Sequence, residues 1–89
     1  MISLIITTYN YGQYLERAIR SALDQTLPIE QYEVIVIDDA STDHTSLILD
    51  NFKDDIRIIR MDKNVGLAAA RNEGIRKAKG QFVVFLDAD

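Results

Sequence analysis

Phe82-Val83-Val84-Phe85-Leu86-Asp87-Ala88-Asp89 is the stretch of this 89-residue sequence that decides the fold. Its five consecutive apolar residues are mostly β-branched or aromatic, which is typical of a strand buried on both faces of a parallel sheet. Ligands of open parallel sheets collect at the carboxyl ends of the strands, and ions such as Mg²⁺ are held there by carboxylates and substrate phosphates. Asp87 and Asp89 are therefore candidate metal ligands. The alternative is that one aspartate caps a turn and the other is solvated.

The composition is that of one small globular domain, with 47% hydrophobic and 27% charged residues. We expect no membrane segment and no signal peptide, because no apolar run approaches about 18 residues and no basic region precedes Ile2. The sequence has no cysteine, which favours a cytoplasmic location. A net charge of −4 argues against nucleic acid as a partner.

Three further apolar runs predict strands at 2–8, 32–37 and 56–60, the last at a sheet edge because arginines interrupt it. Between the strands, a period of 3.6 predicts three helices. The first covers 14–26. The second is capped by Ser41 or Thr42 and carries Leu47, Ile48 and Phe52 on its apolar face. The third covers 67–79, is closed by Gly80, and has Leu67, Arg71, Gly74, Ile75 and Ala78 on one stripe.

This alternation predicts an α/β fold: a Rossmann-like parallel sheet of four strands and three helices, joined by right-handed crossovers. We expect the strand order 3-2-1-4. The carboxyl ends of the first, second and fourth strands then meet at one edge of the sheet. The polar residues expected at this edge are Thr7, Tyr9, Asp38, Asp39, Asp87 and Asp89.

Such a crevice suits a ligand that carries hydrogen-bond donors, a pyrophosphate and a metal ion. Arg71 and backbone N–H groups near Gly66, at a helix start, would bind the phosphates, and Asp39 would accept hydrogen bonds from a base or ribose. Other interpretations stay open. Asp38 and Asp43 could simply belong to a helix-capping loop, and Arg71 could be a surface arginine whose stem covers apolar residues. We expect the single histidine, His44, to be solvated.

Four segments resemble the successive motifs of family 2 glycosyltransferases. They are IITTYNY at 5–11, VIDDASTD at 36–43, NVGLAAARNEG at 64–74 and FLDAD at 85–89. The resemblance implies the A-type glycosyltransferase fold and an inverting enzyme that uses a nucleotide-diphosphate sugar, with a UDP-sugar expected.

The resemblance also implies roles for individual residues. Thr7 and Tyr9 would border the base, and Asp38 and Gly66 would also belong to the nucleotide-sugar-binding site. Asp39 would contact the base or ribose, Arg71 would lie near the base and pyrophosphate, and Asp87 near the ribose and sugar. Asp89, with Asp87, would hold Mn²⁺ or Mg²⁺.

In such enzymes the acceptor-binding portion and the catalytic base follow the Asp-x-Asp motif. Residues 1–89 would then form the N-terminal, nucleotide-sugar-binding half of a longer domain, inactive alone. The longer enzyme could act at the cytoplasmic face of a membrane. We also expect the apolar outer edge of strand 82–86 to be exposed and to join two chains in a symmetric dimer.

Two other functions remain. A phosphotransfer enzyme of the haloacid dehalogenase type also has Asp-x-Asp after an apolar strand, although there the motif follows the first strand. A non-catalytic nucleotide-binding or assembly module is the second. UDP binding that requires Mn²⁺ would favour the transferase, whereas phosphatase activity would contradict it.

Overall fold

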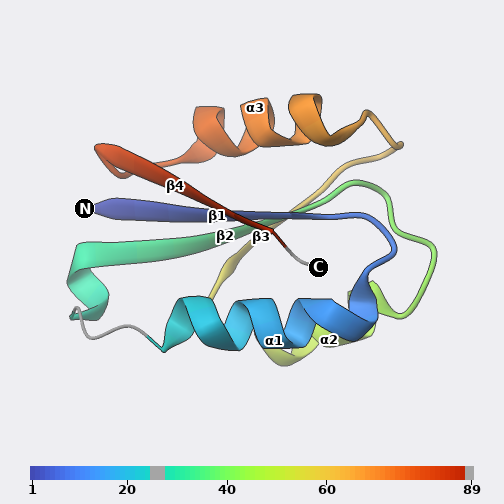
Figure 1. Ribbon diagram of the computed structural model, residues 1–89, viewed down its shortest axis with the longest axis horizontal. Coiled ribbons are helices and arrows are strands. Elements are labelled where there is room, and N and C mark those ends of the chain that lie inside the picture. Colours follow the sequence, from blue (N-terminus) through green and yellow to red (C-terminus); the bar gives the residue numbers. More distant parts are fainter. Residues whose placement is uncertain (25–27, 88–89) are drawn as a thin grey trace.

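The computed structural model describes residues 1–24 and 28–87. Strands and helices alternate along them (Figure 1). The strands are β1 (Ile2–Thr8), β2 (Tyr32–Asp38), β3 (Arg57–Arg60) and β4 (Phe82–Asp87). The helices are α1 (Gly12–Leu23), α2 (Thr45–Asn51) and α3 (Leu67–Lys77), and a 3₁₀ turn at Ile29–Gln31 precedes β2.

The strands form one parallel sheet in the order β3-β2-β1-β4, which confirms the predicted fold class and strand order. β1 lies in the middle of the sheet. Its residue Thr7 is level with Ile37 of β2 on one side and with Asp87 of β4 on the other. All four strands point the same way, so the loops that follow β1, β2 and β3 gather at one end of the sheet, the right-hand end of Figure 1.

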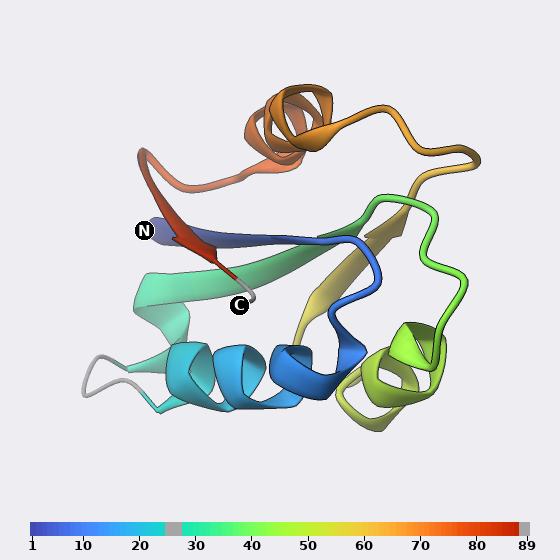
Figure 2. The same ribbon diagram turned by 45° about the vertical axis from the view of Figure 1, so that its right-hand side comes forward.

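Helices cover both faces of the sheet, with α1 and α2 on one face and α3 alone on the other (Figures 1 and 2). Side chains alternate between these faces along a strand. Leu4 and Ile6 accordingly pack in the core beneath α1 and α2, while Ile5 packs in the smaller core beneath α3. The two-sided burial explains why the strand sequences are continuously apolar.

The first two helices differ from the prediction in detail. α1 begins at Gly12 and ends at Leu23; Thr26, its predicted end, lies outside the described residues. The predicted cap of α2 by Ser41 or Thr42 is wrong. The N-cap residue is His44, and the carboxylate of Asp43, one residue before it, accepts hydrogen bonds from the backbone N–H and the hydroxyl of Thr45 at the helix start.

The prediction for α3 was partly wrong. The helix ends at Lys77, and Gly80 is not its left-handed terminal residue. Gly80 instead passes so close to β1 that a Cβ atom would lie 2.7 Å from the carbonyl oxygen of Met1. The small residues Ala70 and Gly74 face the sheet, and Gly74 packs against Ile5. The larger Leu67 and Ile75 are exposed.

A polar cluster ties the sheet together at its other end. Glu33 of β2 accepts hydrogen bonds from the Ser3 hydroxyl (2.6 Å), the Lys79 backbone N–H (2.7 Å) and the Arg57 guanidinium (2.8 Å). Burial acts to raise the pKa of Glu33, but the hydrogen bonds from Ser3, Lys79 and Arg57 outweigh it and hold the pKa below its usual range. The cluster therefore joins β1, β2, β3 and the segment after α3 through one ionised carboxylate.

β4 occupies an edge of the sheet, and its side chains Phe82, Val84 and Phe85 are exposed. This agrees with the expected apolar edge. In the part of the chain that the structure describes, none of the helices has both the length and the apolar character needed to span a membrane.

Candidate functional site

A cavity of about 720 Å³ lies at the carboxyl end of β1, between the loops that follow β1 and β2 and the start of α3. This is the end of the sheet at which parallel α/β folds bind ligands. The described residues that line the cavity are Thr7, Thr8, Tyr9, Tyr11, Asp39, Asn64, Gly66, Leu67, Ala70 and Arg71. The cavity thus brings together Thr7, Tyr9, Asp39, Gly66 and Arg71, which the sequence placed at one site.

Asp39 joins the loop after β2 to the start of α3. The residue is 4% exposed, and its two carboxylate oxygens accept hydrogen bonds from the backbone N–H groups of Val65 (2.8 Å) and Gly66 (2.9 Å). These groups lie at the positive end of the helix dipole, where a carboxylate is stabilising. Asp39 therefore holds the wall of the cavity in place, and only its remaining lone pairs are available to a ligand.

Asp38, also predicted to bind the nucleotide-sugar, has a contact within the fold. It is the last residue of β2, it is buried, and one of its carboxylate oxygens accepts a hydrogen bond from the backbone N–H of Ser41 (3.0 Å). Among the described residues that line the cavity, Asp38 is absent. Its observed contact is with the turn after β2.

Arg71 lies on the first turns of α3 and is half-buried. The Cζ atom of its guanidinium group lies 5.4 Å from the centroid of the Phe85 ring on β4, which is a cation–π contact. This contact spans from α3 to the sheet edge beside the cavity. Arg71 therefore carries a positive charge at the cavity and does not simply extend into solvent.

Asp87 is the last residue of β4, level with Thr7 of β1, so its backbone lies beside the cavity end of the sheet. Its side chain and the whole of Asp89 lie outside the described residues. Among the residues that the structure does describe, no group of three or more His, Cys, Asp or Glu side chains could hold a metal ion. A pair of carboxylates at this position is a suitable donor set for Mn²⁺ or Mg²⁺, which prefer oxygen ligands.

The sequence interpretation did not single out five of the lining residues: Thr8, Tyr11, Asn64, Leu67 and Ala70. Three of them adjoin residues that were singled out: Thr8 lies between Thr7 and Tyr9, Leu67 follows Gly66, and Ala70 precedes Arg71. Tyr11 repeats the aromatic residue two positions before it. Proximity in the sequence to the predicted site residues was the signal that could have identified them.

Asn10 locks the loop after β1 to the loop after β2. Its backbone has a φ of 55°, in the left-handed region that asparagine tolerates. The side-chain oxygen of Asn10 accepts hydrogen bonds from the backbone N–H groups of Thr42 (2.8 Å) and Asp43 (3.3 Å). The backbone N–H of Asn10 donates a hydrogen bond to the Ser41 hydroxyl (2.9 Å). Tyr9 and Tyr11, which line the cavity, flank this lock.

Asp43 completes the connection between these two loops. One of its carboxylate oxygens accepts a hydrogen bond from the Gly12 N–H (3.0 Å), and the other accepts one from the Thr45 N–H (3.0 Å). Desolvation acts to raise the pKa of Asp43, but the hydrogen bonds from Thr45 and Gly12, with the nearby His44, hold the pKa below its ordinary value. Asp43 is thus a structural carboxylate, and His44 is exposed as expected.

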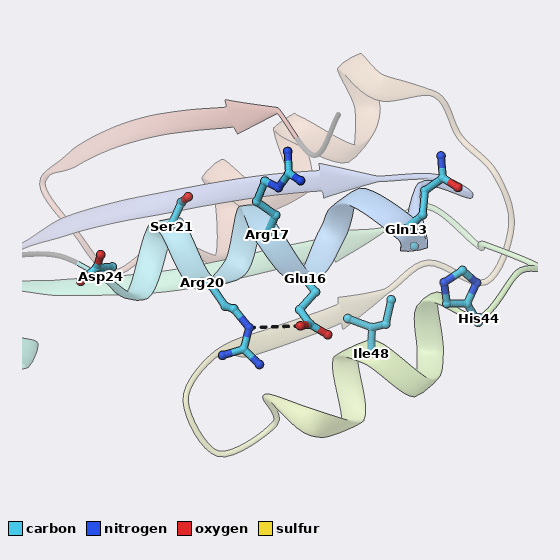
Figure 3. A pocket seen from close by; sticks show the side chains of 9 residues that line it. Gln13, Glu16, Arg17, Arg20, Ser21, Asp24, His44 and Ile48 are labelled. Atoms are coloured by element: carbon cyan, nitrogen blue, oxygen red, sulfur yellow. Dashed lines mark hydrogen bonds and ion pairs between the residues drawn. The ribbon is translucent and has the colours of Figure 1, made fainter.

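A second hollow lies along α1 on the side of α2 (Figure 3). Glu16 and Arg20 point toward α2 and form an ion pair of 3.1 Å, and Arg20 also lies over the Phe52 ring. The remaining charged residues of this hollow, Arg17 and Asp24, are exposed and of opposite sign. The hollow is an open surface that runs along α1 from Gly12 to Asp24 and is bordered by His44 and Ile48 on the side of α2.

The fold and the cavity define an α/β protein with a parallel sheet and a ligand-sized cavity at the carboxyl end of β1. Residues 3–89 match the family model described as glycosyl transferase family 2, and the chain belongs to this family. Its sheet and helices are those of the A-type glycosyltransferase fold.

Two relatives illustrate the similarity in sequence. The chain is 38% identical over 92 residues to a teichuronic acid biosynthesis glycosyltransferase, TuaG, of Bacillus subtilis. The alignment covers 100% of this chain and 36% of TuaG. It is 40% identical over 91 residues to the poly(ribitol-phosphate) β-N-acetylglucosaminyltransferase TarP of Staphylococcus aureus. That alignment covers 99% of this chain and 28% of TarP. The chain thus spans about a third of the length of these relatives.

Two solved structures share the fold closely. Staphylococcus aureus TarS 1-349 in complex with UDP-GlcNAc superposes with a TM-score of 0.91 at 33% identity, covering 99% of this chain and 26% of that one. The mannosyltransferase PcManGT from Pyrobaculum calidifontis, in complex with GDP-Man and Mn²⁺, gives a TM-score of 0.90 at 31% identity. This superposition covers 99% of this chain and 27% of PcManGT.

Proposed function

We propose that these 89 residues bind the donor of a glycosyltransferase, a nucleotide-diphosphate sugar with a UDP-sugar preferred, in the cavity at the end of β1. The observation that carries this proposal is the convergence of Thr7, Tyr9, Asp39 and Arg71 on one cavity of about 720 Å³. Support comes from TarS, a family member of the same fold that was solved with UDP-GlcNAc.

In this proposal Thr7 and Tyr9 border the base, and Asp39 accepts hydrogen bonds from the base or ribose through its free lone pairs. Arg71 provides positive charge close to the base and the pyrophosphate, because it stands at the cavity beside Phe85. Gly66 allows a phosphate oxygen to approach the start of α3, since a side chain is missing there.

Asp87 and Asp89 would hold Mn²⁺ or Mg²⁺, with Asp87 also close to the ribose and the sugar. When bound, the ion would neutralise negative charge on the diphosphate, which then leaves more easily. The Mn²⁺ in the PcManGT complex with GDP-Man supports this assignment in a protein of the same fold.

We further propose that the parent enzyme transfers the sugar with inversion to an acceptor hydroxyl, and that residues 1–89 do not transfer it alone. Transfer to a hydroxyl needs a general base. Of the described residues that line the cavity, Asp39 is the one carboxylate, and backbone N–H groups occupy both of its oxygens. The base is therefore expected from another part of the enzyme.

The test is an NMR titration of the ¹⁵N-labelled chain with UDP, with and without MgCl₂, and with GDP as the competing nucleotide. We expect UDP to shift the amide signals of Tyr9, Val65 and Gly66 in a saturable way, more tightly with metal and more tightly than GDP. Unchanged spectra at millimolar UDP, or hydrolysis of a phosphomonoester substrate, would refute the proposal. The second outcome would favour a phosphotransfer enzyme.

We also propose that the 89 residues associate as a symmetric dimer through the β4 edge, where Phe82 is 66% exposed. An unpaired apolar edge strand is a ready surface for a second copy. Light scattering at a chain concentration of tens of micromolar should give the mass of two chains for the wild type. The Val84→Lys variant should give the mass of one chain. Leu47→Lys, on the exposed face of α2, is the matched control and should remain dimeric. A monomeric wild-type chain would rule the dimer out.

A further inference from the structure

Phe85 is an aromatic residue in a row of aliphatic ones. The register of the sheet places Ile35, Ile5 and Phe85 side by side on β2, β1 and β4, and paired residues of parallel strands face the same side of a sheet. That side is the one covered by α3, because Ile5 and Ile35 pack in one core with Ala70. Phe85 therefore lies on the side of the sheet from which Arg71 approaches.

α3 leaves the end of this row uncovered. The helix packs on β1 and β2 through the small residues Ala70 and Gly74. The two isoleucines are fully buried beneath it, whereas Phe85 on the edge strand is 40% exposed. Arg71 follows Ala70 in the helix, and its guanidinium Cζ atom lies 5.4 Å from the centroid of the Phe85 ring. The arginine side chain thus reaches from the helix over a ring that the helix itself does not cover.

An aromatic ring and a carboxylate hold an arginine in different ways. A carboxylate accepts the N–H groups of the guanidinium and cancels its charge, as Glu73 does with Arg76 at the surface. A ring attracts the guanidinium through the negative potential of its π face, so this contact leaves the positive charge in place. The contact with Phe85 therefore suits an arginine that offers its charge to a ligand.

The position that Arg71 takes in the free protein affects binding. Arginine has a long side chain with many rotamers, and ordering it opposes binding. A ligand that needs one of these rotamers binds more weakly by the fraction of time that the side chain spends in the others. Arg71 lines the donor cavity. A contact that favours this rotamer raises the affinity without touching the ligand.

We propose that Phe85 is a positioning residue of the donor site, whose ring holds the Arg71 guanidinium at the cavity for a negatively charged ligand. This inference rests on the proposed function. Phe85 is not among the described residues that line the cavity, so its effect on the ligand passes through Arg71. The edge strand β4 then takes part in binding through a ring within the strand, in addition to the carboxylates proposed at its end.

The experiment compares UDP binding by wild type, Phe85→Leu and Phe85→Tyr in the NMR titration. Phe85→Leu keeps an apolar side chain but removes the ring. It should bind UDP about two- to fivefold more weakly, because an exposed cation–π contact changes the population of one rotamer by about this factor. Phe85→Tyr keeps the ring and should restore most of the affinity.

Phe82→Leu is the matched control. It removes an exposed ring from the same strand, at a residue that alternation places on the opposite face of the sheet from Phe85. Its UDP affinity should equal that of wild type, which separates the loss of the Arg71 contact from a general weakening of β4.

The Arg71→Ala background shows whether the ring acts through the arginine. In this background Phe85→Leu should cause no further loss of UDP affinity, because no guanidinium remains to be positioned. An equal loss with and without Arg71 would mean that the ring only packs the edge strand, and would overturn the proposal. So would equal affinity of wild type and Phe85→Leu, or a Phe85→Tyr variant as weak as Phe85→Leu, and both would leave the proposed function standing. Failure of wild type to bind UDP would overturn both proposals.

Discussion

One carboxylate oxygen of Asp39 accepts a hydrogen bond of 2.9 Å from the backbone N–H of Gly66, and the other oxygen accepts one from Val65. A side chain at the end of β2 thereby fixes the first residue before α3, although 27 positions separate Asp39 from Gly66. The wall of the donor cavity depends on this connection.

The first prediction concerns this carboxylate. Asp39→Asn replaces one acceptor oxygen by an NH₂ group that would face a backbone N–H, and it removes the charge that favours the helix start. We expect the free energy of unfolding to fall by about 1–3 kcal/mol. Urea denaturation measures this, with Asp62→Asn in the exposed loop before α3 as the control. Equal stability of the two variants would contradict the connection.

The second prediction concerns the backbone of Gly66. Its φ of 92° and ψ of 160° lie in a region that residues with a Cβ atom avoid. A Cβ atom here would meet nothing within 4 Å, so the cost of Gly66→Ala is conformational and not steric. We expect a loss of about 1–3 kcal/mol in the free energy of unfolding and weaker UDP binding. Lys63→Ala, exposed in the same loop, should change neither, and a fully stable Gly66→Ala would refute the assignment.

The third prediction concerns the pH dependence from Glu33, whose folded-state pKa lies below the ordinary value of 4.5. A lowered pKa means that ionised Glu33 stabilises the folded chain above pH 4.5, and that this contribution is lost as the pH falls through the lowered value. Glu33→Gln should cost about 1–3 kcal/mol at pH 7, since hydrogen bonds to a charged acceptor are lost.

Urea denaturation of wild type and Glu33→Gln between pH 7 and pH 3 measures this effect. The difference between the two proteins should shrink as the pH falls below 4.5, while the other carboxylates titrate equally in both. A difference that is constant over this range would show that the charge of Glu33 contributes nothing.

The fourth prediction concerns Asn10. Asn10→Gly keeps the left-handed backbone but removes the oxygen that accepts hydrogen bonds from Thr42 and Asp43. We expect weaker UDP binding, because Tyr9 and Tyr11 on either side lose their support. Asn10→Ala should also lose about 1–2 kcal/mol from its left-handed backbone.

NMR titration and thermal unfolding of both Asn10 variants distinguish these two effects. Gln13→Ala, exposed at the start of α1, provides the control. If Asn10→Gly bound UDP as wild type does, the lock between the loops would have no role in binding.

Much of the fold could be predicted from the sequence. The limits of β1 were correct, because a short apolar run rich in β-branched residues is typical of a strand buried on both faces. The strand order followed from right-handed crossovers. The convergence of Thr7, Tyr9, Asp39 and Arg71 was also anticipated, since it depends on topology alone.

The remaining features depend on contacts between distant segments. Gly80 was expected to close α3. It instead passes close to Met1 and Ser3, where a side chain would not fit, and no local sequence pattern reveals such a contact. The predicted stripe identified the buried face of α3 only in part. Gly74 and Ala78 pack toward the sheet, whereas Leu67 and Ile75 are exposed. The partners of Asp39 are backbone groups, which carry no sequence signal.

The central position of β1 has a consequence for synthesis on the ribosome. β1 is made first, yet one of its two neighbours, β4, ends only at Asp87. At about 5–20 residues per second, several seconds pass before this partner exists. During that time the apolar edge of the nascent first strand has no native neighbour on one side, and the chain must avoid pairing it with another polypeptide.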